Sequence, residues 1–332
     1  MFLIIVSVIF GVIAALALAS IKFIFSEHLA KKFYRLFALA DLVVLVVLIG
    51  GFMLRSFVPE FFIVLFGNVA TVFIMAQLIG GVLIMGAVVV RQIYRKFNPP
   101  KPFDPARRRA LVHGMIYPAL SLAVSLYGNR IEKNRDVENS YDVPIKDLPP
   151  ELEGFRLAQI SDIHLGAYFS LERLESLLQR IADAKPDLLA ITGDIFDDNS
   201  MNPAAVKIVD AFTDKFKFGI WYIHGNHEHF RGIRAIEAEL AQTKIHWLVN
   251  RSEHVTSKLY ILGVDYPSRA PITSRSDKER EQLFIEARKK LVDAAAANVP
   301  ADAVKILLAH HPEFIDDGAE RHFALTLTGH TH

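Results

Sequence analysis

The stretch FRLAQISDIHLG at residues 155–166 contains the pattern that decides the fold of this chain. A short apolar run ends there in Asp162 and His164, two side chains of the kind that bind metal ions. Leucine and isoleucine then recur at helical spacing over residues 170–184, and residues 187–192 form another short apolar run. Strands that alternate with helices in this way predict a layered α/β domain.

The alternation continues to the end of the sequence. The spacing predicts helices at 203–214, 232–242 and 276–297, and strands at 218–223, 245–249, 259–264, 305–309 and 323–328. Ligands of open α/β sheets bind at the carboxyl ends of strands, so the residues that follow each strand matter most for function.

Metal-type side chains follow five of the predicted strands. The five groups are Asp162 with His164, Gly193 with Asp194, Gly225 to Glu228, His310 with His311, and Gly329 to His332. Carboxylate, imidazole and amide ligands suit zinc, iron or manganese. A single aspartate or histidine after a strand is usually a turn or surface residue, but five such groups in one domain predict a metal centre. The sequence contains no cysteine, which excludes disulfides, iron–sulfur clusters and thiolate zinc sites.

In chain order the five groups read DIH, GD, GNHE, HHP and GHTH, and they resemble the signature of the calcineurin-like metallophosphoesterases. With its apolar start, the chain is most similar to the membrane-anchored branch that contains the YkuE and YaeI type proteins. The resemblance implies a four-layer αββα sandwich with two divalent metal ions at its edge. Chains of the family normally continue beyond GHTH with glycines and further strands, so the C-terminal end is expected to be truncated.

The resemblance also implies a role for each matching residue. By motif position, one metal takes Asp162, His164 and His332, the other takes Asn226, His310 and His330, and Asp194 bridges both. His227 is expected to donate a proton to the leaving oxygen or to hydrogen-bond the phosphate. Asp197 and Glu228 are expected either to orient the ligands or to be solvated loop carboxylates. The remaining histidines of these segments are expected either to face the substrate or to lie on the surface; they are His224, His229 and His311.

The implied activity is hydrolysis of a phosphodiester or pyrophosphate bond by a hydroxide that two metal ions (Mn, Zn or Fe) activate. The substrate is expected to be a phosphorylated small molecule or a lipid, because a membrane anchor holds the domain near lipid headgroups. Nucleotide substrates stay open. The alternative function is a membrane-anchored, non-catalytic sensor that binds a phosphorylated ligand.

Charge divides the chain into two unlike halves. Residues 1–127 contain 12 basic and 4 acidic side chains, whereas residues 128–332 contain 25 basic and 32 acidic ones. The formal charges are therefore +8 and −7. Because the half of ordinary globular composition is acidic, nucleic acid is not expected as a partner.

The first half is predicted to lie in a membrane. Apolar runs at 1–21, 36–54, 61–90 and 111–127 predict about four transmembrane helices in a membrane domain at residues 1–127. A linker at 128–153 and a metallophosphoesterase domain at 154–332 complete the predicted organisation. The first run lacks preceding basic residues and is followed by further spans, so it is predicted to be an anchor and not a cleaved signal peptide.

The basic residues predict the orientation of these spans. Lysine and arginine are concentrated in the loops after the first and third spans, which places both loops in the cytoplasm. The chain is therefore predicted to be a multi-pass cell-membrane protein with an extracytoplasmic catalytic domain, and a fourth span that failed to insert would reverse that side. The polar residues Asn68, Gln77 and His113 are expected to bond a neighbouring helix or to mark a transport path.

Overall fold

The structure is a computed structural model. It describes residues 9–19, 27–53, 58, 60–97, 119–132, 135–166, 169–267 and 277–331. The chain forms two compact units, Met1–Ser140 and Tyr141–His332. The predicted ligand His332, the polar residue His113 and parts of the first and last predicted spans (1–8, 20–21 and 111–118) lie outside the described residues.

Unit 1 is helical. It contains α2 (Glu27–Met53) and α3 (Glu60–Phe97), together with helical residues 9–19 and 119–130. Among the described residues, the segment Leu65–Phe97 is long and apolar enough to cross a bilayer, with a mean hydropathy of 2.4. The segment Ile9–Ala19 is a shorter apolar helix. The number of spans and their orientation stay predictions.

Two of the polar residues predicted within spans bond another helix of unit 1. The Gln77 side chain on α3 donates a hydrogen bond of 2.6 Å to Asp41 Oδ1 on α2. The Asn129 side chain donates to Asn68 Oδ1 at 3.4 Å. One of the two expectations for Asn68 and Gln77, a bond to a neighbouring helix, is therefore confirmed.

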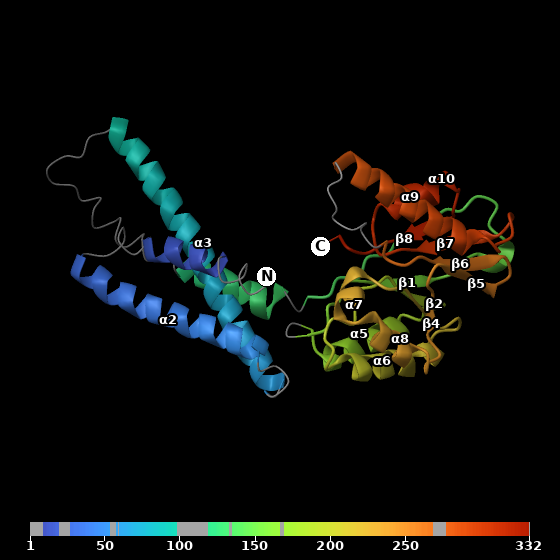
Figure 1. Cartoon of the computed structure of the whole chain (residues 1–332), viewed down its shortest axis with the longest axis horizontal. Helices are drawn as coiled ribbons and strands as arrows, with labels where there is room; N and C mark the ends of the chain where they lie inside the picture. Colours follow the sequence, from blue (N-terminus) through green and yellow to red (C-terminus); the bar gives the residue numbers. More distant parts are fainter. Residues whose placement is uncertain are drawn as a thin grey trace. The chain divides into compact units, whose positions relative to one another are not determined.

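Unit 2 contains two four-stranded sheets (Figure 1). The first sheet is parallel and has the order β1 (Leu157–Ile160), β2 (Leu188–Ile191), β3 (Ile220–Tyr222) and β4 (His246–Trp247). The second has the order β5 (Arg251–Thr256), β6 (Leu259–Gly263), β7 (Val304–Leu308) and β8 (Leu325–Leu327). Strand β5 pairs antiparallel with β6, and β6, β7 and β8 are parallel.

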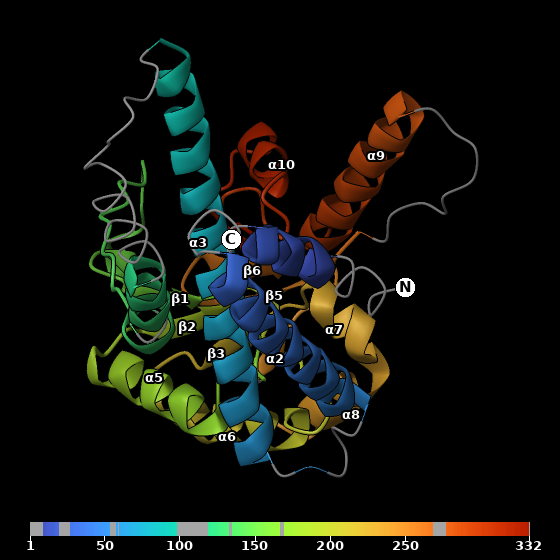
Figure 2. The ribbon, with the colours of Figure 1, turned by 90° about the vertical axis from the view of Figure 1, so that its left-hand side faces the viewer.

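The helices of unit 2 lie on opposite sides of the pair of sheets. Helices α5 (Leu171–Asp183), α6 (Asn202–Ala211) and α8 (Ile233–Leu240) lie on the side of the first sheet, and α9 (Asp277–Ala296) and α10 (Phe314–Glu320) lie on the other (Figures 1 and 2). The short α7 (Asn226–Arg231) follows β3.

Three hydrophobic clusters separate these layers. One joins the first sheet to α5, α6 and α8, one joins the two sheets, and one joins the second sheet to α9 and α10. Strand β2 shows how: Leu189 and Ile191 face the helices, while Leu188 and Ala190 face the other sheet. A strand that is buried on both faces is apolar throughout, which explains the unbroken LLAI sequence.

Three elements were not predicted from the spacing of apolar residues. Strand β5 has the polar sequence RSEHVT because it lies at the edge of its sheet and has only one strand neighbour. Helices α7 and α10 contain six and seven residues, too few for a helical period to be recognised. The GNHE motif therefore runs directly into a helix.

Candidate metal centre

The predicted ligands meet at the carboxyl ends of strands from both sheets. Asp162 and His164 follow β1, Asp194 follows β2, Asn226 begins α7 after β3, His310 follows β7, and His330 follows β8. Backbone hydrogen bonds join neighbouring strand ends, from Asp162 N to Gly193 O at 3.1 Å and from Gly329 N to His310 O at 3.0 Å. Six of the seven predicted ligands thus gather at one edge.

His310 lies at the centre of one group of potential ligands. Its Nδ1 donates to Thr192 O at 2.7 Å, which leaves the lone pair of Nε2 free in the neutral ring. That Nε2 lies 3.1 Å from Asn226 Oδ1, 3.3 Å from Asp194 Oδ2 and 3.2 Å from His330 Nδ1. Burial lowers the pKa of His310, but the Asp194 carboxylate, 3.3 Å from Nε2, outweighs burial and raises it.

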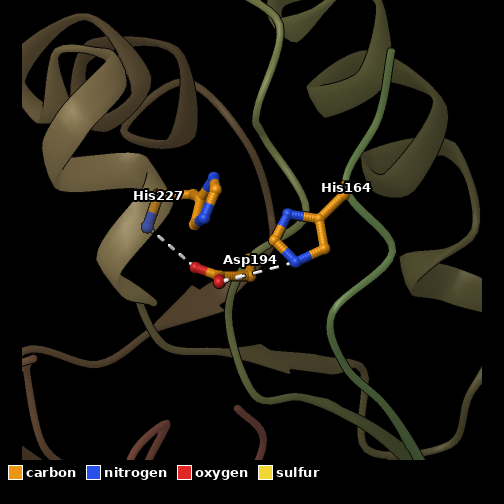
Figure 3. A group of neighbouring side chains, drawn as sticks. All are labelled: His164, Asp194 and His227. Carbon is orange, nitrogen blue, oxygen red and sulfur yellow. Dashed lines mark hydrogen bonds and ion pairs between the residues drawn. The ribbon is translucent and has the colours of Figure 1, made fainter. Parts of the chain in front are cut away.

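Asp194 also belongs to a second group, with His164 and His227 (Figure 3). His164 Nε2 lies 3.7 Å from Asp194 Oδ2, and the His227 backbone N–H donates to Asp194 Oδ1 at 2.9 Å. Figure 3 shows the two imidazoles next to each other beside the carboxylate, and their ring centroids are 4.5 Å apart. A carboxylate shared by two groups occupies the position that a bridging ligand requires.

These residues fit a metal ion. The Asp194 side chain is fully buried, and its Oδ2 makes no hydrogen bond within the described part of the chain. A buried carboxylate oxygen that accepts no hydrogen bond is costly, and a divalent cation would satisfy it. Nearby, both oxygens of Asp162 accept the His330 backbone N–H, at 3.1 and 2.9 Å, which fixes that carboxylate at the same edge.

Left-handed backbone is concentrated at the predicted ligands. The φ angles are 56° at Asp162, 49° at His164, 55° at Asp194 and 65° at His330. Each such conformation of a residue other than glycine costs about 1–3 kcal/mol and persists only where the surrounding structure imposes it. Strain of this kind gathers at functional sites, which supports the assignment of this edge.

Two glycines let the loops after β2 and β3 approach each other. Gly193 has φ 91°, and a Cβ added there would lie 2.5 Å from Gly225 N. A Cβ on Gly225 would lie 2.1 Å from Asp194 Oδ1. Glycine in the GD and GNHE motifs is therefore required because backbone packs on backbone beside the bridging position.

Glu228 is a buried acceptor for the same two loops. Its Oε2 accepts the N–H groups of Asp194 and Gly225 at 3.0 and 2.8 Å, and its Oε1 accepts those of Ile195 and Phe196 at 2.8 and 3.0 Å. The side chain is fully buried. Glu228 thus positions Asp194 through the backbone N–H of that residue.

Asp197 holds the two histidines that flank Asp194. Its carboxylate lies 3.4 Å from His164 Nδ1 and 3.0 Å from His227 Nδ1, and Arg231 Nε donates to it at 2.6 Å. Burial raises the pKa of Asp197, but hydrogen bonds with His164, Arg231 and His227 outweigh burial and hold it well below its usual range. In turn, the hydrogen bond to Asp197 raises the pKa of His164.

The other three histidines of these segments, His224, His229 and His311, differ in their contacts. His224 is 1% exposed, so the expectation that it lies on the surface is wrong; the strand β3 leads it into the interior. His311 is also buried. Its ring stacks on that of His330 with 4.9 Å between the ring centroids, and its Nδ1 bonds the Glu313 carboxylate. His229 Nε2 donates to Asp265 Oδ1 at 2.8 Å.

Sequence reasoning missed two side chains of this region, Arg231 and Asp265. Asp265 lies two positions after β6, so the strand-end rule that found the other ligands could have found it. Arg231 has no comparable signal, because its contact with Asp197 depends on a helix too short to recognise.

The fold and site together define an α/β domain with a candidate metal centre at a shared strand edge. Residues 155–332 match the family model described as Calcineurin-like phosphoesterase. The chain belongs to this family. The description of the family names phosphoesterases, and the His and Asp groups of the site could hold metal ions.

Similar proteins carry the same description. The chain is 26% identical over 208 residues to "Transmembrane protein with metallophosphoesterase domain" of Danio rerio. The matched region covers 58% of this chain and 43% of that protein. It is 28% identical over 211 residues to "Uncharacterized metallophosphoesterase YkuE" of Bacillus subtilis (strain 168), covering 62% and 68%. The chain therefore spans less than half of the zebrafish protein. The name of that relative describes a transmembrane protein, and the segment Leu65–Phe97 of this chain is long and apolar enough to cross a bilayer.

Proposed function

We propose that this chain hydrolyses a phosphodiester or pyrophosphate bond with two divalent metal ions (Mn, Zn or Fe). Asp194 carries the proposal, because it belongs to two groups of side chains, one with His164 and His227 and one with His310 and His330. Within each group the potential ligand atoms lie within 4.8 Å of one another. We assign Asp162, His164 and His332 to one metal, and Asn226, His310 and His330 to the other. When bound, two such metals supply a hydroxide nucleophile and neutralise the phosphoryl oxygens.

The protein's own groups position the reacting parts. The Thr192 carbonyl fixes the His310 ring through Nδ1, which aims Nε2 at Asp194. Asp197 lies 3.0 Å from His227 Nδ1 and so leaves His227 Nε2 as the ring nitrogen that reaches a substrate. His227 is 32% exposed in its side chain, in contrast to the buried Asp194. This combination suits a proton donor to the leaving oxygen.

The substrate is proposed to be a phosphorylated small molecule, with an amphiphilic or lipid-linked ester favoured over a soluble nucleotide. A multi-pass anchor would hold an extracytoplasmic catalytic domain at the membrane surface, where lipid headgroups are concentrated. The apolar segment Leu65–Phe97 supports the anchor. The layering of two sheets between helices likewise supports the four-layer αββα sandwich of the family.

The test uses the full chain purified in detergent and supplied with manganese or zinc. Turnover is measured on an aryl phosphodiester, an aryl phosphomonoester and a lipid-linked pyrophosphate. We expect hydrolysis of the diester or the pyrophosphate, and we expect His227→Ala to lose turnover while it keeps its metal. Activity on the monoester alone would overturn the bond preference. Ligand binding without turnover in the wild-type chain would favour the sensor.

A further inference from the structure

Three side chains beside the candidate centre form a separate cluster. His224 follows β3, His229 lies in α7, and Asp265 follows β6. Their potential ligand atoms all lie within 4.8 Å of one another. Asp265 Oδ1 lies 2.8 Å from His229 Nε2 and 3.4 Å from His224 Nδ1. None of the three belongs to the ligand set implied by the family motifs.

His224 is the unexplained member of this cluster. It is 1% exposed, and neither of its ring nitrogens makes a hydrogen bond within the described part of the chain. Aromatic rings surround it, with the centroids of Tyr222 and Trp247 each 5.7 Å from its own. A buried imidazole that makes no hydrogen bond and lies at ion-pair distance from a carboxylate requires a further partner.

We propose that His224, His229 and Asp265 bind one zinc-class transition-metal ion, in addition to the metals at Asp194. Two imidazoles and one carboxylate are a zinc ligand set that leaves a fourth position for water. Magnesium and calcium are disfavoured because they require oxygen ligands. Tetrahedral zinc with bonds of about 2.0 Å separates its ligand atoms by about 3.3 Å. The distance of 3.4 Å between Asp265 Oδ1 and His224 Nδ1 is close to that spacing, whereas the distance of 2.8 Å to His229 Nε2 is that of a hydrogen bond and would lengthen on binding.

The surroundings of Asp265 support its role as a ligand. The Tyr266 N–H donates to Asp265 Oδ1 at 2.8 Å, and the Asp265 N–H donates to Asn250 Oδ1 at 3.0 Å. These two bonds fix the carboxylate toward the histidines, as outer hydrogen bonds do at other metal sites. A hydrogen-bonded pair of His229 and Asp265 without metal would leave both nitrogens of the His224 ring unsatisfied.

The ion would join the two sheets. His224 extends from β3 of the first sheet, and Asp265 extends from β6 of the second. His229 adds α7, the helix that also carries Asn226 and His227. A bound metal would therefore hold the helix of the proposed proton donor against the second sheet.

The test compares zinc content per chain after dialysis of the full protein in detergent. The variants are His229→Gln and Asp265→Asn. The matched control is His254→Gln, on β5, where the ring bonds Ser257 O at 2.7 Å and lies outside the cluster. We expect each cluster variant to hold one zinc ion fewer per chain than the wild type, and the control to hold the wild-type amount. Equal zinc content in all four proteins would overturn the proposal.

A second comparison separates this site from the centre at Asp194. In an Asp194→Asn chain, one zinc ion per chain is expected to remain, and adding His229→Gln is expected to remove it. A chain that keeps no zinc after Asp194→Asn alone would overturn the proposal. His229 is 31% exposed in its side chain, so its replacement is tolerated better than that of buried His224. Circular dichroism of each variant verifies the fold.

Discussion

The shared strand edge and the hydrophobic layers beneath it differ in what their residues contribute. At the edge, four predicted ligands have left-handed backbone, and a buried carboxylate oxygen lacks a hydrogen bond. In the described residues of the eight strands, by contrast, no residue has positive φ. The layers stabilise the fold through apolar contacts such as those of Leu178 and Leu308. The free energy gained in the hydrophobic layers thus offsets the strain at the edge. Substitutions in the two regions should therefore have different effects on turnover and on the free energy of unfolding.

The largest effect is expected for Asp194→Asn. Loss of the shared charge should lower turnover by about 10³-fold, equivalent to about 4 kcal/mol in the activation free energy. The free energy of unfolding of the metal-free chain should fall by less than that of a core variant, because the amide oxygen of asparagine can still accept the His227 backbone N–H, although the ion pair with His310 is lost. The measurements are turnover, metal content and thermal unfolding. A stability loss as large as that of a core variant would contradict the comparison.

Leu178→Ala tests the opposite region. Leu178 on α5 is fully buried in the cluster under the first sheet. Removing its side chain leaves a cavity and should lower the free energy of unfolding by about 3 kcal/mol. Metal content and turnover of the folded fraction should stay at the wild-type level. The control is Ile315→Ala on α10, where the side chain is 50% exposed. The free energy of unfolding should fall much less in this control. Denaturant titration measures the free energy of unfolding of both variants.

The contrast also explains what the sequence could predict. Asp162, Asp194 and His310 were predicted because each directly follows a strand, and strand ends converge wherever the sheet is parallel. The positive φ angles and the burial of His224 were not, because they arise from contacts between loops distant in the sequence. Apolar composition likewise predicts the long helix α3 of unit 1 but cannot by itself fix the number of spans.

An intermediate effect is expected for Glu228→Gln, because Glu228 is fully buried like the residues of the layers but bonds the loops of the edge. Its buried carboxylate accepts four backbone N–H groups of the loops after β2 and β3. The amide keeps one acceptor oxygen, so the free energy of unfolding should fall by about 2 kcal/mol. Metal affinity should fall about 10-fold, since Asp194 is positioned by those bonds. Denaturant titration and metal titration measure the two losses, with Glu175→Gln on the exposed face of α5 as the control.

The smallest effect is expected for Arg231→Gln at the outer rim of the edge. Arg231 donates to Asp197 at 2.6 Å, but its side chain is 43% exposed, so solvent screens the pair. The same Asp197 carboxylate keeps its contacts with His164 and His227 when the arginine is lost. Turnover should therefore fall by less than about 5-fold, the factor that corresponds to about 1 kcal/mol. Arg234→Gln, at an exposed position on the next helix, should change nothing. A loss as large as that of Asp194→Asn would mean that Arg231 contacts the substrate, and the functional edge would then extend beyond the buried ligands.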